Sequence, residues 1–301
     1  GALLRFTARS VNMRERLDYS CAIFTPTGEL IANGPHMPVH LGSMGASVRH
    51  VLEVRGSALG EGDTVLLNDP FHGGTHLPDL TVVTPVYDEN DLLLGWTASR
   101  AHHAEIGGMR PGSMPPSATT LAEEGVVINP MKIIEAGVPR FDRLESILGE
   151  GPWPSRCLED NLADVRAAIA ANHAGACSLH DLAKSAGSGQ VMDAMKQLHD
   201  HASDLAMQAI RALPDGSFKA MEEMDDGTPL AVTIDIDGDR ARVDFTGTSG
   251  VHPGNLNATE AIVRSVVLYV FRLLVDEDIP LNEGCLKPLK VIIPEGCMLA
   301  P

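Results

Sequence analysis

The sequence predicts an α/β protein of the mixed α+β kind, built from three successive parts. Short apolar runs bounded by Gly and Pro fill residues 1–154, as is typical of strands joined by loops. Residues 155–214 are rich in Ala and Leu, with apolar positions near a period of 3.6. Alternating strand patterns return in residues 215–301. We therefore expect mixed sheets with long loops, a helical segment, and a strand-rich last part that is incomplete at its C-terminus.

The first part is expected to hold buried strands and one helix. The strand patterns cover residues 19–24, a hairpin return from Leu30, 64–67, 80–87 and 92–101. An acidic turn at 88–91 joins the last two of these runs. The spacing of apolar residues predicts a helix over 43–54 after a loop at 34–42, and a long ordered loop over 107–140.

The other two parts follow from changes in periodicity. Two helices are predicted over 158–174 and 178–213, the second bent around Gly187 and Gly189. The last part is expected to contain strands at 218–224, 230–236 and 240–245, a helix at 258–275 and a strand at 289–293. Asp237-Gly238 marks a hairpin turn.

Charge and cysteine content narrow the class of protein. The formal net charge of −17 argues against a nucleic-acid or an anionic-membrane partner, because little in the chain would neutralise phosphates. The five cysteines are scattered and never form a CxxC pair, which favours a reducing compartment. We expect a soluble, cytoplasmic protein. No phosphate-binding loop or dinucleotide fingerprint is visible in the sequence.

Histidine is concentrated in one region. Seven of the twelve histidines lie between positions 36 and 103. If strands 80–87 and 92–101 pair, Asp79 lies beside His102, with His76 and His103 close by. Converging imidazoles and carboxylates are what a divalent metal with open positions requires. The alternative is that each histidine is an ordinary hydrogen-bonded residue.

The histidine pair at 36 and 40 and the basic segment 9–16 each allow a functional and a structural interpretation. His36 and His40 are four residues apart, but the prolines at 35 and 38 predict a loop rather than a shared helix face. His40 is a candidate proton shuttle or a satisfied core residue. The basic segment 9–16 is a candidate for an anionic substrate, although ion pairs with Glu15 and Asp18 are favoured.

Taken together, several segments resemble the hydantoinase B / 5-oxoprolinase family. The resemblance rests on SVNMRERLDYSCA (10–22), PVHLGSM (38–44), NDP (68–70), GTHLPD (74–79), SRAHHAEIGG (99–108), PGSMPP (111–116), EGV (124–126) and DFTGTS (244–249). It covers essentially the whole chain. Family members extend well past Pro301, which implies a domain truncated at its C-terminus, and they usually have Asp where this chain has Glu105.

The resemblance implies a division of labour in a hetero-oligomer. A hydantoinase A-type partner, separate or fused, would bind ATP and phosphorylate the carbonyl oxygen of a small-molecule substrate. By likeness to the carboxylase branch, a divalent metal (Mn, Zn or Mg) would be held by His76, Asp79 and His103. The remaining candidates are His102 or Glu105 as general base, and Asp69 and His40 as residues that orient the ligands.

The function expected from this is that of the B component of an ATP-dependent cyclic amide hydrolase, with 5-oxoproline or a hydantoin as substrate. Water on the metal would attack the activated carbon. A second hypothesis keeps the metal but carboxylates acetone or an aryl ketone. A third is a non-catalytic structural subunit, which the presence of His76, Asp79, His102 and His103 disfavours.

Overall fold

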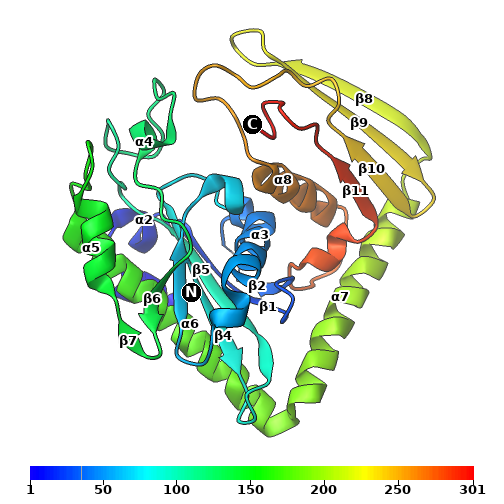
Figure 1. Cartoon of the computed structure of the whole chain (residues 1–301). Coiled ribbons are helices and arrows are strands. Elements are labelled where there is room, and N and C mark those ends of the chain that lie inside the picture. Colours follow the sequence, from blue (N-terminus) through cyan, green and yellow to red (C-terminus); the bar gives the residue numbers. More distant parts are fainter. Residues whose placement is uncertain (35) are drawn as a thin grey trace.

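The computed structural model describes residues 1–34 and 36–301, so the predicted loop at 34–42 lies partly outside it. Two sheets are connected by two long helices, which form a V at the bottom of Figure 1. These helices are α6 (Leu158–Ala186) and α7 (Ser188–Arg211). The expected mixed α+β class is confirmed. No helix in the described ranges is both long and apolar enough to cross a membrane.

The first sheet has seven antiparallel strands in the order β2-β1-β5-β4-β3-β6-β7. Their bounds are β1 Tyr19–Phe24, β2 Leu30–Asn33, β3 Thr64–Leu67, β4 Asp79–Tyr87, β5 Leu93–His102, β6 Met131–Glu135 and β7 Val138–Pro139. Strands β6 and β7 lie inside the segment 107–140, so the prediction of one long loop there was wrong.

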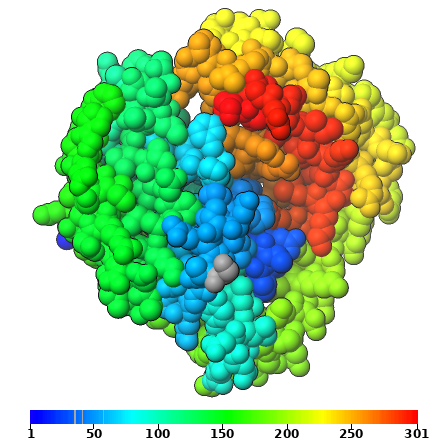
Figure 2. Space-filling model, in the orientation of Figure 1, coloured from blue at the N-terminus to red at the C-terminus, as the bar shows by residue number. Residues whose placement is uncertain are grey.

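The second sheet has four strands in the order β11-β10-β9-β8. Their bounds are β8 Gly216–Glu223, β9 Pro229–Asp237, β10 Arg240–Asp244 and β11 Leu289–Ile292. The predicted hairpin turn at Asp237-Gly238 joins β9 to β10, whereas β10 and β11 run parallel. In Figure 2 the C-terminal segment (red) and the α8 region (orange) lie between the first part of the molecule and this sheet (yellow).

Helices α3 and α6 cover opposite faces of the first sheet. Besides α6 and α7, the α-helices of the described chain are α1 Ala2–Thr7, α2 Val11–Arg14, α3 Pro38–Arg55, α4 Leu121–Glu124, α5 Phe141–Gly149 and α8 Glu260–Leu273. Val48 of α3 packs with Val65 and Val83 on one face, and Val165 of α6 packs with Leu66 and Val82 on the other. This burial on both faces explains the continuous apolar runs in these strands.

Two helix boundaries differ from those expected. The first long helix runs unbroken through Gly175, which packs against the Thr97 side chain, and ends only at Gly187, whose φ of +95° L side chains rarely adopt. Helix α3 begins at Pro38, because proline fits the first turn of a helix, where its missing N–H has no partner to lose. His40 is therefore helical, and the prediction of a loop there was wrong.

Gly73 brings the loop before β4 against α3. Its φ is +86°, and a Cβ at this position would lie 2.2 Å from the backbone nitrogen of Ser47. Gly137 has a similar φ of +78°, but nothing lies within 4 Å of its Cβ position. A comparison of substitutions at the two glycines therefore separates the cost of a steric clash with α3 from the cost of a side chain at positive φ.

We expect Gly73→Ala to destabilise the protein far more than Gly137→Ala. The control substitution carries only the strain of a positive φ, about 1 kcal/mol. The Gly73 substitution adds a backbone clash, worth at least about 2 kcal/mol more. Free energies of unfolding from denaturant titration measure both. Equal losses would show that the loop does not depend on contact with α3.

Candidate functional site

Polar side chains gather where strands β4 and β5 meet at one end of the sheet. As the sequence predicted, the two strands pair, and their register places Asp79 opposite His102. A cavity of about 410 Å³ opens at this end. Its lining residues are Asn12, Arg16, Asp18, Met37, Val39, His40, His76, Asp79, His102, Ala104, Gly112 and Ser113.

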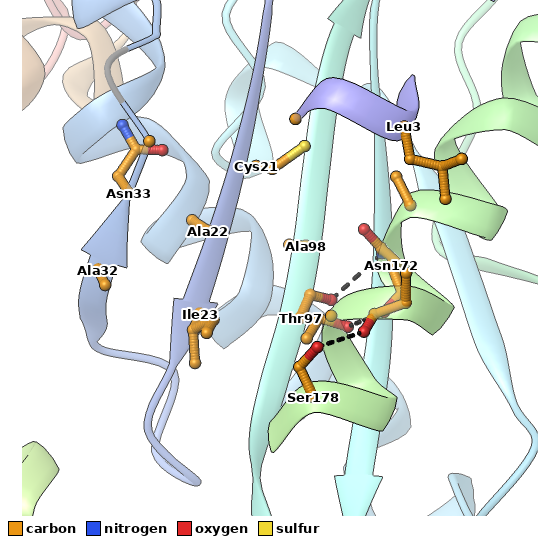
Figure 3. Close-up of a pocket in the computed structure, with 15 residues that line it drawn as sticks. Leu3, Cys21, Ala22, Ile23, Ala32, Asn33, Thr97, Ala98, Asn172 and Ser178 are labelled. Carbon is orange, nitrogen blue, oxygen red and sulfur yellow. Dashed lines mark hydrogen bonds between the residues drawn. The ribbon is translucent and has the colours of Figure 1, made fainter. Parts of the chain in front are cut away.

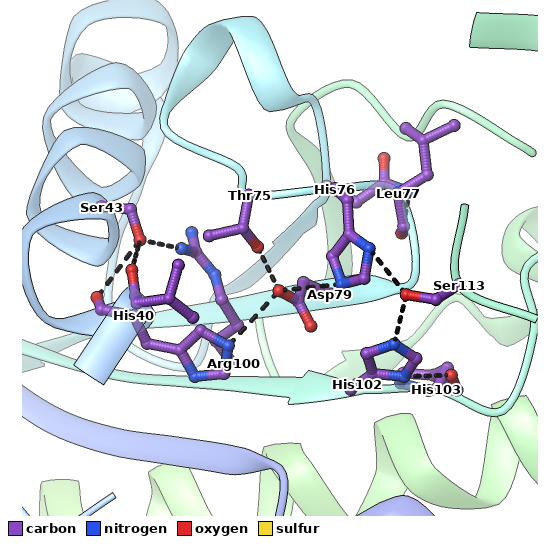
Figure 4. Close-up of polar contacts among 12 residues, drawn as sticks. His40, Ser43, Thr75, His76, Leu77, Asp79, Arg100, His102, His103 and Ser113 are labelled. Atoms are coloured by element: carbon purple, nitrogen blue, oxygen red, sulfur yellow. Dashed lines mark hydrogen bonds and ion pairs between the residues drawn. The ribbon is translucent and has the colours of Figure 1, made fainter. Parts of the chain in front are cut away.

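Asp79 lies at the centre of the site (Figure 4). Its Oδ2 atom is 3.3 Å from His40 Nε2 and 3.3 Å from His76 Nε2, and it also accepts a hydrogen bond from the Thr75 hydroxyl. The other carboxylate oxygen, Oδ1, is buried and has no hydrogen-bond partner. Buried polar atoms are nearly always paired, so this oxygen is available to a bound molecule or ion.

The pairing of Asp79 with two histidines changes its protonation. Burial alone would raise the pKa of Asp79, but His40 and His76 outweigh it and hold that pKa well below the usual value. Burial would likewise lower the pKa of His76, yet the hydrogen bond and charge of Asp79 raise it. The site therefore combines an ionised carboxylate with an imidazole that holds its proton more tightly than usual.

The guanidinium of Arg100 is fully buried next to this group. It donates to the hydroxyls of Thr81, Ser43 and Ser47, and to the carbonyl of Gly73. Burial lowers the pKa of Arg100 to about 10, so the side chain stays charged near neutral pH. This cation joins β4, β5, α3 and the loop before β4.

His102 approaches His76 on the cavity side. The two ring centroids are 4.8 Å apart, with one ring edge-on to the other. The Ser113 hydroxyl lies between them, 3.1 Å from His76 Nδ1 and 3.0 Å from His102 Nε2. Of the residues expected at the site, the structure thus brings His40, His76, Asp79 and His102 together.

His103 does not join them. The Nδ1 atom of its buried ring lies 2.9 Å from the Oδ1 atom of Asn161 in α6. Burial lowers the pKa of His103. Successive residues of an extended chain point to opposite faces, which is why His102 and His103 separate. In residues 1–34 and 36–301 there is no group of three or more His, Cys, Asp or Glu side chains that could hold a metal ion.

Two other expected residues have their hydrogen-bond partners outside the cavity. Glu105 is buried and accepts hydrogen bonds from the backbone N–H groups of Gly107, Arg156 and Cys157 and from the Ser155 hydroxyl. These bonds fix the start of α6, as an N-cap does. Asp69 caps the short turn at Pro70–His72, because its carboxylate accepts a hydrogen bond from the N–H of Phe71. Its Oδ2 atom also lies 2.7 Å from His72 Nδ1.

Two parts of the basic segment 9–16 lie in different surroundings. Arg9 forms an ion pair of 3.6 Å with Asp160 rather than with the expected Glu15 or Asp18. Arg16 lines the cavity together with Asp18. Asn12, also from this segment, contacts His102 Nδ1 at 2.8 Å.

A second cavity, of about 450 Å³, lies between β1, β5 and α6 (Figure 3). Its walls are mainly small apolar residues, and the Asn172 amide there donates to the carbonyls of Val82 and Thr97. None of the described residues that line it is His, Asp, Glu, Lys or Arg. It therefore lacks the groups for acid–base chemistry that the first cavity has.

Sequence reasoning missed Ser113, Thr75 and Arg100 as parts of the site. The segment 111–116 was noticed only as a matching motif, because a serine in a loop carries no periodic signal. Arg100 was noticed in the same way, inside the strand-end motif. Its burial follows from the packing of α3 on the sheet, which strand periodicity does not reveal.

Comparisons with known proteins agree on one family. The model described as hydantoinase B/oxoprolinase matches residues 1–301. The 5-oxoprolinase 1 of Arabidopsis thaliana is 42% identical to this chain over an alignment of 328 residues. The alignment covers 100% of this chain and 26% of that relative. The chain thus spans about a quarter of the length of this relative.

Two solved structures share the fold. The ATP-dependent caprolactamase from Pseudomonas jessenii superposes with a TM-score of 0.89 at 28% identity, covering 99% of this chain and 52% of that one. A nucleotide-free acetone carboxylase superposes with a TM-score of 0.87 over 99% of this chain and 41% of that one. Its identity is 18%, so this likeness concerns the fold alone.

The contacts of Glu105 predict a pH-dependent structural role. Burial would raise its pKa, but the hydrogen bonds from Ser155, Gly107, Cys157 and Arg156 outweigh burial and lower it. A carboxyl whose folded pKa is depressed stabilises the fold above its ordinary pKa of 4.5, and this contribution is lost as the pH falls through the folded value.

We therefore expect Glu105→Gln to cost about 2 kcal/mol at pH 7, because it replaces a charged acceptor of several hydrogen bonds. It should also flatten the loss of stability below about pH 4.5. Denaturant titrations from pH 3 to pH 7 measure both effects, with the exposed Glu159→Gln as control. An unchanged acid slope in the Glu105 variant would contradict this role.

Proposed function

Because the chain belongs to the hydantoinase B/oxoprolinase family, we propose that it is the B-type part of an ATP-dependent enzyme that opens a cyclic amide. The proposed substrate is 5-oxoproline or a hydantoin. The observation that carries the proposal is the cavity in which His40, His76, Asp79 and His102 converge. An A-type partner, separate or fused, would bind the ATP.

The chemistry begins with activation by the partner. Amide resonance makes the ring carbonyl a poor target, and transfer of a phosphoryl group to its oxygen removes that resonance. Water then adds to the activated carbon, and the ring nitrogen departs with a proton, which leaves an acyl phosphate. A second water releases the phosphate and leaves the carboxylate. The residues of this chain have two tasks in these steps: to take a proton from water and to supply one to nitrogen.

The two histidines on the cavity side are suited to different tasks. Asp79 raises the pKa of His76, so this imidazole keeps its proton to a higher pH than an ordinary histidine and has one to supply to the departing nitrogen. His102, whose ring centroid is 4.8 Å from that of His76, takes the proton of the attacking water. Glu105 is excluded as the base, because its hydrogen bonds lower its pKa and it does not line the cavity.

We expect His76→Ala to lower ring opening by about 100-fold or more, the usual size of a lost general acid. The assay uses the full-length protein with its partner and measures ATP cleavage and ring-opened product from 5-oxoproline and from hydantoin. His72→Ala, in the same loop but outside the cavity, is the control and should turn over normally.

The same assay tests the proposed reaction itself. Turnover supported by acetone with bicarbonate, and by neither ring, would contradict ring opening and favour carboxylation. Wild-type turnover in the His76 variant would contradict the role of this cavity.

A divalent cation is a separate part of the proposal. His76 and Asp79 are the two expected ligands brought together in the described chain, fewer than the three of a preformed metal group, because the third, His103, faces α6. The unpartnered Oδ1 of Asp79 supports a cation there. A cation on His76 Nε2 would replace the proton that this nitrogen shares with Asp79, so His76 would then be a ligand and not the acid. When bound, such a cation would polarise a carbonyl oxygen or lower the pKa of water.

We expect the purified full-length protein to contain about one divalent metal per chain, and Asp79→Asn to lose most of it. Elemental analysis after dialysis measures this, with Asp69→Asn as a matched carboxylate outside the cavity. A wild-type protein without metal, but active, would contradict the cation.

A further inference from the structure

Ser113 occupies a special place in the proposed site. Its hydroxyl lies within hydrogen-bond distance of two imidazole nitrogens, His76 Nδ1 at 3.1 Å and His102 Nε2 at 3.0 Å (Figure 4). The residue comes from a loop and lines the cavity. No other hydroxyl drawn in Figure 4 lies between two histidines.

A single hydroxyl can donate to only one of the two histidines. It has one proton to donate and two lone pairs with which to accept. Where one of the two ring nitrogens is bare, the hydroxyl donates to that nitrogen and accepts from the other, which carries a hydrogen. The direction of this chain decides which nitrogen of each ring bears hydrogen.

The surroundings of His102 settle the direction. Its Nδ1 is 2.6 Å from the carbonyl oxygen of His103, which can only accept, so Nδ1 bears the hydrogen. The Asn12 amide nitrogen lies 2.8 Å from the same ring nitrogen and 3.4 Å from the same carbonyl oxygen. A hydrogen on Nδ1 requires this amide to be turned so that its oxygen faces the ring, which gives up its long bond to the carbonyl. In the neutral ring Nε2 is then the bare nitrogen, and Ser113 donates to it.

The rest of the chain follows. Because the Ser113 proton points to His102, its oxygen accepts from His76 Nδ1–H. His76 is thereby held with Nε2 towards Asp79, at 3.3 Å from Oδ2. One hydroxyl thus makes the two rings different: His102 has a bare nitrogen on the cavity side, and His76 has a fixed N–H.

We propose that Ser113 is a positioning residue that sets the tautomers and ring orientations of His76 and His102. The part of this inference that concerns turnover rests on the proposed function, since it assigns the base to His102 and the acid to His76. The part that concerns ring geometry stands without it.

A matched set of variants tests the inference. Ser113→Ala removes the hydroxyl, Ser113→Thr keeps it, and Ser117→Ala removes an exposed hydroxyl from the same loop. Crystal structures of the full-length protein and its variants show the positions of the His76 and His102 rings. We expect the alanine variant to lose the position of at least one ring, while the threonine variant and the Ser117 variant keep both.

Turnover provides the second readout. We expect Ser113→Ala to lower kcat for ring opening by about 10- to 100-fold, as for groups that orient a reacting residue, with thermal stability unchanged. In a background that lacks both rings, His76→Ala with His102→Ala, the same substitution should have little further effect, because Ser113 acts through those two rings.

The outcomes separate the two proposals. If both rings keep their positions in the alanine variant, the inference is overturned whatever the activity. If a ring moves and threonine restores it, the inference stands, even in a wild-type protein that opens no cyclic amide. That last result would overturn the proposed function alone.

Discussion

The buried Arg100 guanidinium is the interaction on which the rest of the site depends. No carboxylate of residues 1–34 or 36–301 forms an ion pair with it, so its N–H groups are satisfied by three hydroxyls and the Gly73 carbonyl, while the charge of Asp79 acts on it from beyond ion-pair distance. A buried charge that loses its partners is costly, so α3, the β4–β5 hairpin and the loop before β4 must keep one arrangement. Helix α3 supplies His40, the hairpin supplies Asp79 and His102, and the loop supplies His76.

The same arrangement explains why Asp79 is ionised although it is buried. Burial favours the neutral acid, but two imidazoles and the Thr75 hydroxyl point at one of its oxygens. The cost of burying the carboxylate is thus offset by groups from two different segments, α3 and the loop before β4. In return the carboxylate raises the pKa of His76, which lines the cavity together with His102.

Much of the site could be predicted from the sequence, because it depends on local pairing. Two apolar runs joined by a short acidic turn must lie antiparallel, and this placed Asp79 opposite His102. The alternation of a strand also indicates that His102 and His103 face opposite ways, but the family resemblance led to His103 as a ligand. Glu105 caps a helix that starts more than 50 residues later in the chain, and no local pattern signals such a long-range contact.

The last part of the chain, residues 215–301, also supports the site. Ser265 of α8 accepts a hydrogen bond from the N–H of Gly42, just after His40, and a Cβ on Gly42 would lie 2.8 Å from the Ser265 backbone. Asn255 donates to the carbonyl of Pro115, two residues from Ser113. The helix that carries His40 and the loop that carries Ser113 are therefore both held by residues 250–270. Hence changes near α8 can alter the positions of the two groups that orient Asp79 and His76, without any contact with a substrate.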